Sequence, residues 1–316
     1  MIEINEIRVT KEQSGIRLDK FLKNYFNNLS RNKIENYIKN GLILVNSKKT
    51  KPGYFLREYD VISFSQNFPQ EKLELKPLSL FPEPDILYED ENILVINKPI
   101  NILVHPTKNS LSQPSIVSWF LFKYPQIKDV GDDPLRPGIV HRLDKDTSGV
   151  LILTKNQKAF QYFKNLFSQR KIQKIYLVLV KGELKHKEGS ISYQIGKAKD
   201  FPKRKVILNT AVKGKEALTI FKVIKNFKNY TLLEVIPKTG RTHQIRVHLA
   251  SIGFPVLGDR LYGRIKAKEK QLVPRQMIHA FQISFPYFDN KMLSFKAPLP
   301  QDFSQILDQL TKKGSL

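Results

Sequence analysis

Cysteine is absent from this chain of 316 residues. Disulfides, thiolate catalysis and zinc sites built from cysteine are therefore excluded. Long hydrophobic runs are also missing, and the longest fall far short of the roughly 20 apolar residues that cross a bilayer. The first six residues, MIEINE, lack a basic stretch followed by an apolar core, so we expect no signal peptide. We therefore expect a soluble, cytoplasmic protein.

Acidic residues are scarce relative to basic ones. The chain has 29 Asp and Glu against 53 Lys and Arg, which gives a net charge of +24. This charge favours a polyanionic partner, because each phosphate neutralised by a basic side chain releases condensed counterions. The alternatives are an anionic membrane surface and a lysine-rich composition that serves solubility. We favour nucleic acid as the partner.

The first 65 or so residues form a small unit. Helical spacing predicts one helix that begins after Gly15 and a second that is capped by Ser30, with strands near residues 42–45 and 61–64. Basic side chains gather on and between these elements: Arg17, Lys20, Arg31, Lys33, Lys48 and Lys49. On charge alone, a solvated helix face explains them as well as a binding surface does.

Prolines mark the next stretch, at positions 69, 77, 82 and 84. They interrupt regular structure and predict an extended linker, so we place the domain boundary near residue 75. The predicted organisation is a small domain with the start of the linker over residues 1–75, a linker over 76–85 and a large domain over 86–316. The residue count suffices for a sizeable core in the large domain.

Residues 141–149, which read HRLDKDTSG, are the most informative stretch of the large domain. The pattern predicts a loop that ends in a turn at Gly149 and continues into a buried strand. Asp144 and Arg142 would then lie on a loop held by a rigid scaffold, where catalytic groups are commonly placed. Taken alone, an ordinary turn is the simpler explanation, because residues 146–148 are natural turn and cap residues.

The rest of the large domain reads as alternating strands and helices. The helix predicted over residues 156–170 has Phe160, Phe163 and Phe167 on one face, which we expect in the core. Tyr176 begins an apolar strand, where most tyrosines are half-buried packing. We expect residues 275–285 to close the sheet.

A further block, residues 238–250, reads KTGRTHQIRVHLA. It predicts a turn at Gly240 and a helix from about Thr242. His243 and His248 are five residues apart, not the four that place two imidazoles on one helical face, so we expect no metal site.

Three blocks together resemble the RluA-type pseudouridine synthases. Residues 141–149 match their signature H-R-L-D-x-x-T-S-G at every fixed position, a strand ending in Lys98 and Pro99 resembles their first block, and residues 238–250 resemble their third. Residues 15–22, with Ser30, Arg31 and residues 41–46, are similar to the alpha-L RNA-binding motif of a small-subunit ribosomal protein and bacterial tyrosyl-tRNA synthetases. That likeness implies that the basic residues of the small unit contact RNA phosphates.

The resemblance implies roles for four residues. Asp144 is the essential carboxylate, and Arg246 is expected to pair with it and favour its ionised form. Tyr176 stacks on the target uracil, and Arg142 fills the gap left by the flipped nucleotide. The isomerisation requires neither metal nor redox cofactor. Asp144 could attack the sugar, attack the base ring or remove a sugar proton, and the residues do not distinguish these routes.

We therefore predict a two-domain RNA pseudouridine synthase of mixed α+β fold. Its catalytic domain is a mostly antiparallel sheet flanked by helices, preceded by a small α/β RNA-binding domain. Large-subunit ribosomal RNA is the expected substrate, transfer RNA is the alternative, and we expect a monomer. The rival hypothesis is a non-catalytic RNA-binding or ribosome-assembly factor that keeps the fold.

Overall fold

The chain divides into two units in a computed structural model, Met1–Glu74 and Leu75–Leu316. The structure describes residues 6–26, 29, 31–65, 75, 77–80, 83–106, 113–198, 203–207, 214–263 and 273–313. Leu80, inside the predicted linker, is buried in the core of the larger unit beside Trp119. The last linker residues that are described therefore belong to the larger unit.

The smaller unit packs two helices on a three-stranded antiparallel sheet with the order β1-β3-β2. Its elements are β1 (Glu6–Arg8), the 3-10 helix η1 (Lys11–Gln13), α1 (Leu18–Tyr25), α2 (Arg31–Lys39), β2 (Ile43–Val45) and β3 (Val61–Phe64). Leu18 and Leu22 of α1 and Ile34 and Ile38 of α2 are fully buried. Because residues four apart share one face of a helix, each pair turns toward the same core. The predicted cap Ser30 lies outside the described residues.

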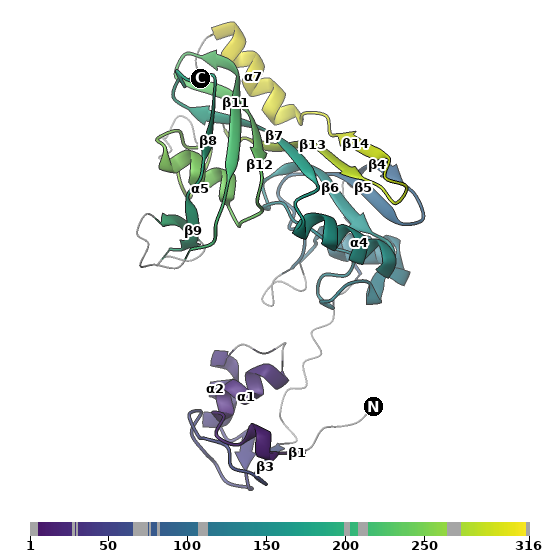
Figure 1. Ribbon diagram of the computed structural model, residues 1–316, viewed down its shortest axis with the longest axis vertical. Coiled ribbons are helices and arrows are strands. Elements are labelled where there is room, and N and C mark those ends of the chain that lie inside the picture. The colour runs from purple at the N-terminus through teal and green to yellow at the C-terminus, as the bar shows by residue number, and fades with distance from the viewer. Residues whose placement is uncertain are drawn as a thin grey trace. The chain divides into compact units, whose positions relative to one another are not determined.

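One twisted sheet runs through the larger unit (Figure 1). Its strand order is β4-β5-β6-β13-β7-β12-β11-β8, and β14 pairs with β13. The bounds are β4 (Asp85–Glu89), β5 (Ile93–Lys98), β6 (Ser148–Thr154), β7 (Gln173–Lys181), β8 (Glu188–Ile191), β11 (Thr219–Phe227), β12 (Tyr230–Pro237), β13 (Ile278–Pro286) and β14 (Met292–Lys296). Among the described pairings of this sheet, only that of β13 with β6 is parallel. The predicted α+β fold with a mostly antiparallel sheet is confirmed.

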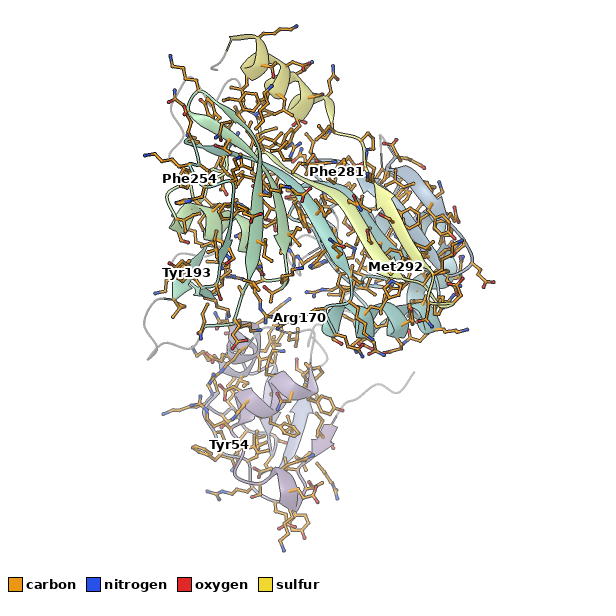
Figure 2. All side chains as sticks on the ribbon, turned by 45° about the horizontal axis from the view of Figure 1, so that its top comes forward. Tyr54, Arg170, Tyr193, Phe254, Phe281 and Met292 are labelled. Carbon is orange, nitrogen blue, oxygen red and sulfur yellow. The ribbon has the colours of Figure 1, made fainter. Side chains whose placement is uncertain are left out.

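Helices cover both faces of this sheet. They are α3 (Ile116–Lys123), η2 (Pro125–Asp129), α4 (Gln157–Ser168), α5 (Gln244–Ser251) and α7 (Gln301–Lys313), and a separate hairpin pairs β9 (Gln194–Lys197) with β10 (Arg204–Ile207). Val178 of β7 packs in the core under α5, while the next residue, Leu179, packs in the core under α7. Successive side chains of a strand point to opposite faces, so one strand supplies both cores. Figure 2 shows side chains filling both faces.

Two expectations about this unit need correction. Residues 275–285 do not close the sheet, because β13 lies in its interior between β6 and β7. Phe160 and Phe163 are buried as expected, but Phe167 is only half-buried: it packs against the core that holds Phe163, and it also lines a cavity and stacks on His141. No helix among the described residues is long and apolar enough to span a membrane.

Candidate active site

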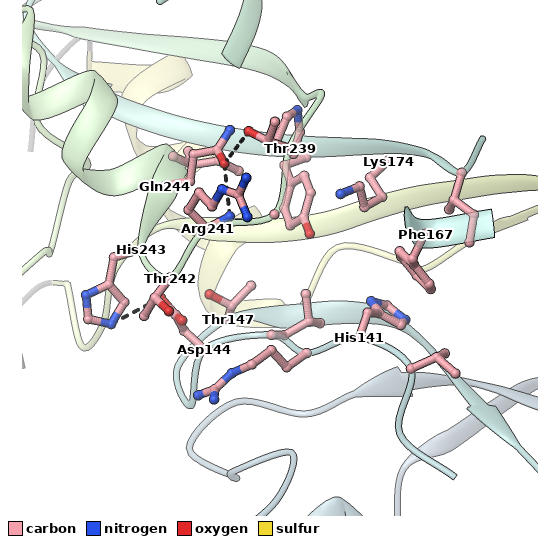
Figure 3. Close-up of a pocket in the computed structure, with 18 of the residues that line it drawn as sticks. His141, Asp144, Thr147, Phe167, Lys174, Thr239, Arg241, Thr242, His243 and Gln244 are labelled. Atoms are coloured by element: carbon pink, nitrogen blue, oxygen red, sulfur yellow. Dashed lines mark hydrogen bonds and ion pairs between the residues drawn. The ribbon is translucent and has the colours of Figure 1, made fainter. Parts of the chain in front are cut away.

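A cavity of about 600 Å³ lies in the larger unit between the loop that precedes β6, the start of β7 and residues 237–246 (Figure 3). Asp144 is the only acidic residue among the described ones that line it. The basic residues that line it are Arg136, Arg142, Arg170, Lys174, Lys238, Arg241 and Arg246. A carboxylate surrounded by so many cations suits a reaction on a polyanion.

Arg246 joins two carboxylates at the base of the cavity. Its Nη1 donates to Asp144 Oδ2 at 2.9 Å, while Nε and Nη2 donate to the two oxygens of Asp259 at 2.7 and 2.9 Å. The Asp259 side chain is fully buried, that of Arg246 is 6% exposed and that of Asp144 is 22% exposed. Burial alone lowers the pKa of Arg246, but the two carboxylates outweigh it and raise that pKa. The expected contact of Arg246 with Asp144 is therefore present.

Asp144 keeps one oxygen available. No described residue donates a hydrogen bond to its Oδ1, and the imidazole Nε2 of His243 lies 3.9 Å from Oδ2. His243 is fixed by a 2.9 Å hydrogen bond between its Nδ1 and the Tyr262 hydroxyl, and burial lowers the pKa of His243. A carboxylate held through one oxygen, with the other facing a cavity, can act as a nucleophile or as a base.

The strand that follows Asp144 explains two residues of the central motif. A Cβ on Gly149, whose φ is 115°, would lie 2.2 Å from the Ala280 carbonyl oxygen, so only glycine allows β6 and β13 to pair there. Ser148 Oγ lies 2.9 Å from His279 Nδ1. At the start of the motif, His141 Nε2 accepts from the Ile152 N–H at 2.9 Å. The loop is thus tied to the sheet on both sides of Asp144.

Lys98 supports the loop that carries Asp144. Its side chain is fully buried, and its Nζ donates to the carbonyl oxygens of Pro99, Ile102 and Lys145 at 2.6, 2.9 and 3.1 Å. Burial lowers the pKa of Lys98 to about 7, although Asp146 opposes the shift. Satisfying three carbonyls keeps both the loop and the strand end of β5 in place.

Arg275 holds the other side of the loop. Its Nη1 donates to the Asp146 carbonyl at 3.1 Å and its Nη2 to Ser148 Oγ at 3.3 Å. Its Nε and Nη2 also pair with both oxygens of Asp302, in the first turn of α7, at 2.6 and 3.0 Å. The C-terminal helix is therefore connected to the loop that carries Asp144.

Arg142 and Tyr176 also line the cavity. Arg142 Nη1 donates to His105 Nε2 at 3.2 Å, and burial together with this guanidinium lowers the pKa of His105 to about 3. Burial, and then the charge of Asp144, raises the pKa of the Tyr176 phenol. The structure thus brings Asp144, Arg142, Tyr176 and Arg246 to one cavity.

The basic residues predicted to bind RNA in the smaller unit differ in their surroundings. Arg17 Nε lies 3.0 Å from the buried carboxylate of Asp19, and Arg31 Nε donates to it at 2.7 Å. Both arginines remain solvent-accessible, with side chains 43% and 53% exposed. The others lie at the surface, fully or in part: Lys20, Lys33, Lys48 and Lys49.

Several residues of the site were not identified from the sequence. Asp259 and Arg275 drew no functional interpretation, and His243 was considered only as a metal ligand. Among the described residues, no group of three His, Cys, Asp or Glu side chains could hold a metal. The sequence carries no local signal for these residues, because their side-chain partners lie 13 or more residues away along the chain.

The cavity, with one carboxylate among cations, defines an enzyme that acts on a polyanionic substrate. A family model described as RNA pseudouridylate synthase matches residues 92–251, and the model of the S4 domain matches residues 16–62. The chain therefore belongs to the RNA pseudouridine synthase family, whose members are isomerases acting on RNA, and carries an S4 domain. The resemblance found in the sequence is confirmed.

Individual relatives cover nearly the whole chain. The Bacillus subtilis protein named uncharacterized RNA pseudouridine synthase YlyB is 34% identical over 98% of this chain and 100% of its own length. Ribosomal large subunit pseudouridine synthase D of Borreliella burgdorferi is 34% identical over 98% of this chain and 95% of its own. Among solved structures, human RNA pseudouridylate synthase domain containing 4 has a TM-score of 0.57 at 25% identity, and covers 72% of this chain and 93% of its own.

Proposed function

We propose that this enzyme isomerises uridines of large-subunit ribosomal RNA and that Asp144 is its essential carboxylate. The observation that supports the role of Asp144 is its geometry: one oxygen is held by Arg246, and the other accepts no hydrogen bond from the described residues at the cavity. The ribosomal substrate is supported by the name of the Borreliella burgdorferi relative. Transfer RNA is the alternative substrate.

The other residues take roles that follow from their positions. Tyr176 is the platform on which the target uracil stacks, beside Asp144. Arg142, held by His105, occupies the space that the flipped nucleotide leaves. The S4 domain binds RNA phosphates through its exposed basic side chains, so residues 1–75 position the RNA and residues 86–316 carry out the reaction. The pairing of Arg17 and Arg31 with Asp19 orients two guanidinium groups at this surface.

The test is pseudouridine mapping on total RNA from cells with and without the gene. Complementation uses the unmutated protein, Asp144→Asn and, as matched control, Asp146→Asn, which makes the same charge change in the same loop outside the cavity. We expect ribosomal sites to be lost and restored by all but Asp144→Asn. Restoration by Asp144→Asn contradicts the essential role. Losses confined to transfer RNA contradict the ribosomal substrate, and no lost site at all favours the non-catalytic alternative.

A further inference from the structure

Lys174 is a cation of the cavity that has no partner among the residues the structure describes. It lies on β7, and no described residue accepts a hydrogen bond from it or forms an ion pair with it. Burial, with no acidic group to oppose it, lowers the pKa of Lys174 to about 8. By contrast, Arg246 has two carboxylates and Lys98 has three carbonyls. Lys174 is half-buried, so its ammonium is partly desolvated and its donors remain available to a ligand that enters the cavity.

The position of Lys174 relative to Tyr176 indicates which ligand atom it meets. The two residues are separated by one residue on β7, and both line the cavity. Strand β13 pairs with β7 along both of them, with a bulge in β13 between Ala280 and Gln282, and β12 pairs with β7 from Tyr176 onward. Their side chains therefore lie on the same face, about 7 Å apart along the strand. In Figure 3 Lys174 points into the cavity with its amino group turned away from Phe167, and Asp144 lies on the far side. A base stacked on Tyr176, with its sugar at Asp144, extends toward Lys174.

Phosphate groups have other basic residues available to them. The cations at the rim of the cavity, which are solvent-exposed, are Arg136, Arg142, Arg170 and Lys238. Phosphates stay hydrated on the RNA backbone and suit such exposed side chains. Lys174 is less exposed than these residues and has no acceptor among the described residues, so it suits the part of the nucleotide that enters the cavity, the base.

We propose that Lys174 binds a carbonyl oxygen of the target uracil and stabilises the negative charge that forms there during the reaction. This rests on the proposed function, in which Asp144 acts on a uridine stacked on Tyr176. When the bond from uracil N1 to sugar C1′ breaks, its electron pair stays on the base and spreads over the carbonyl oxygens. The new bond then forms from C5 to C1′, C5 loses its proton, and N1 takes up a proton from solvent.

The role of Lys174 does not depend on how Asp144 acts. If the carboxylate attacks the sugar or removes a sugar proton, the base departs with the electron pair of the N1–C1′ bond. If the carboxylate adds to C6 of the ring, the electrons of the C5–C6 double bond move toward the C4 carbonyl oxygen. Charge grows on the same oxygens in each route. A partly desolvated cation in the cavity binds that charge more strongly than it binds neutral uracil, and only this difference accelerates the reaction.

The experiment compares Lys174→Met, Lys174→Arg and a control, Lys171→Met, whose exposed lysine lies outside the cavity. Single-turnover rates come from tritium release from RNA labelled at uridine C5, using whichever RNA the unmutated enzyme modifies, so the inference is tested apart from the ribosomal assignment. Asp144→Asn serves as the inactive reference. RNA dissociation constants are measured as a function of salt, and melting temperatures are recorded.

We expect Lys174→Met to lower the single-turnover rate about 100-fold, as loss of one stabilising charge does in other enzymes. Its RNA affinity should change less than about threefold, and its melting temperature should stay equal or rise, because an unpaired ammonium has been removed. Lys174→Arg should lose about tenfold or less, and Lys171→Met should match the unmutated enzyme. An unchanged rate in Lys174→Met overturns the proposal. So does a lower melting temperature, or a weaker affinity whose salt slope falls by about one, which marks a phosphate contact.

Discussion

The ion pair between Arg275 and Asp302 yields a quantitative prediction for Asp302→Asn. The Arg275 side chain is 4% exposed and that of Asp302 is 19% exposed, so this pair is largely removed from solvent. Loss of one partner of a buried pair costs about 3–5 kcal/mol. The asparagine keeps one carbonyl acceptor and Asp302 is partly solvated, so we expect about 2–3 kcal/mol. In a unit of this size, that lowers the melting temperature by roughly 5–10 °C.

The assay is thermal and urea unfolding followed by circular dichroism. Asp308→Asn is the matched control, because Asp308 lies on the exposed face of the same helix, and such surface changes stay within about 0.5 kcal/mol. Measurements of enzymatic activity distinguish the role of Asp302 from that of Arg275. Asp302→Asn leaves the hydrogen bond from Arg275 to the Asp146 carbonyl in place, so turnover at 20 °C should fall less than about threefold. Arg275→Met removes that bond and should fall at least about tenfold. If Asp302→Asn is as stable as Asp308→Asn, the reasoning is refuted.

Two further predictions concern Lys98 and Tyr176. The pKa of Lys98 is about 7 in the folded protein and about 10.4 in the unfolded chain, which therefore binds more protons between these values. Lys98 thus makes the free energy of unfolding rise by up to about 4 kcal/mol from pH 7 to pH 10. In urea unfolding, the Lys98→Met variant should lose this part of the rise. If the variant and the unmutated protein show the same dependence of stability on pH, the prediction is contradicted. Tyr176→Phe should retain most of kcat/KM, while Tyr176→Ala should lose roughly 10- to 100-fold because stacking disappears. Equal activity of the two variants would exclude the platform.

Local pattern in the sequence predicts much of the secondary structure. The helix expected over residues 156–170 is α4, and Asn156 caps it by accepting from the Ala159 N–H. The buried strand expected after Gly149 is β6. Strand order is a different matter, because period-2 alternation shows that a strand is buried and not which neighbours it has. The interior position of β13 was missed for this reason.

The roles of individual residues were also predicted only in part from the sequence. The contact of Asp144 with Arg246 joins residues 102 positions apart, and only the family resemblance predicted it. Asp259 completes that site by burying a second carboxylate against the same guanidinium, a geometry that no local pattern indicates. Phe167 shares helical spacing with two core residues, yet it lies at the end of α4 beside the cavity. Helical periodicity in the sequence shows which face of a helix is buried, but it does not show whether core residues or a cavity lie against each turn of that face.

The interior position of β13 has a consequence for the order in which the protein can be completed during synthesis. Strands β6 and β7 are made long before β13, yet they have no direct pairing in the described sheet and are joined only through it. Until residues 278–286 leave the ribosome, the two halves of the sheet stay separate, and Arg275 and Asp302 cannot anchor the loop of Asp144. Catalytic competence therefore requires that the chain has been made at least as far as Asp302. A nascent chain can already expose its finished S4 domain to RNA while it is still unable to modify a base.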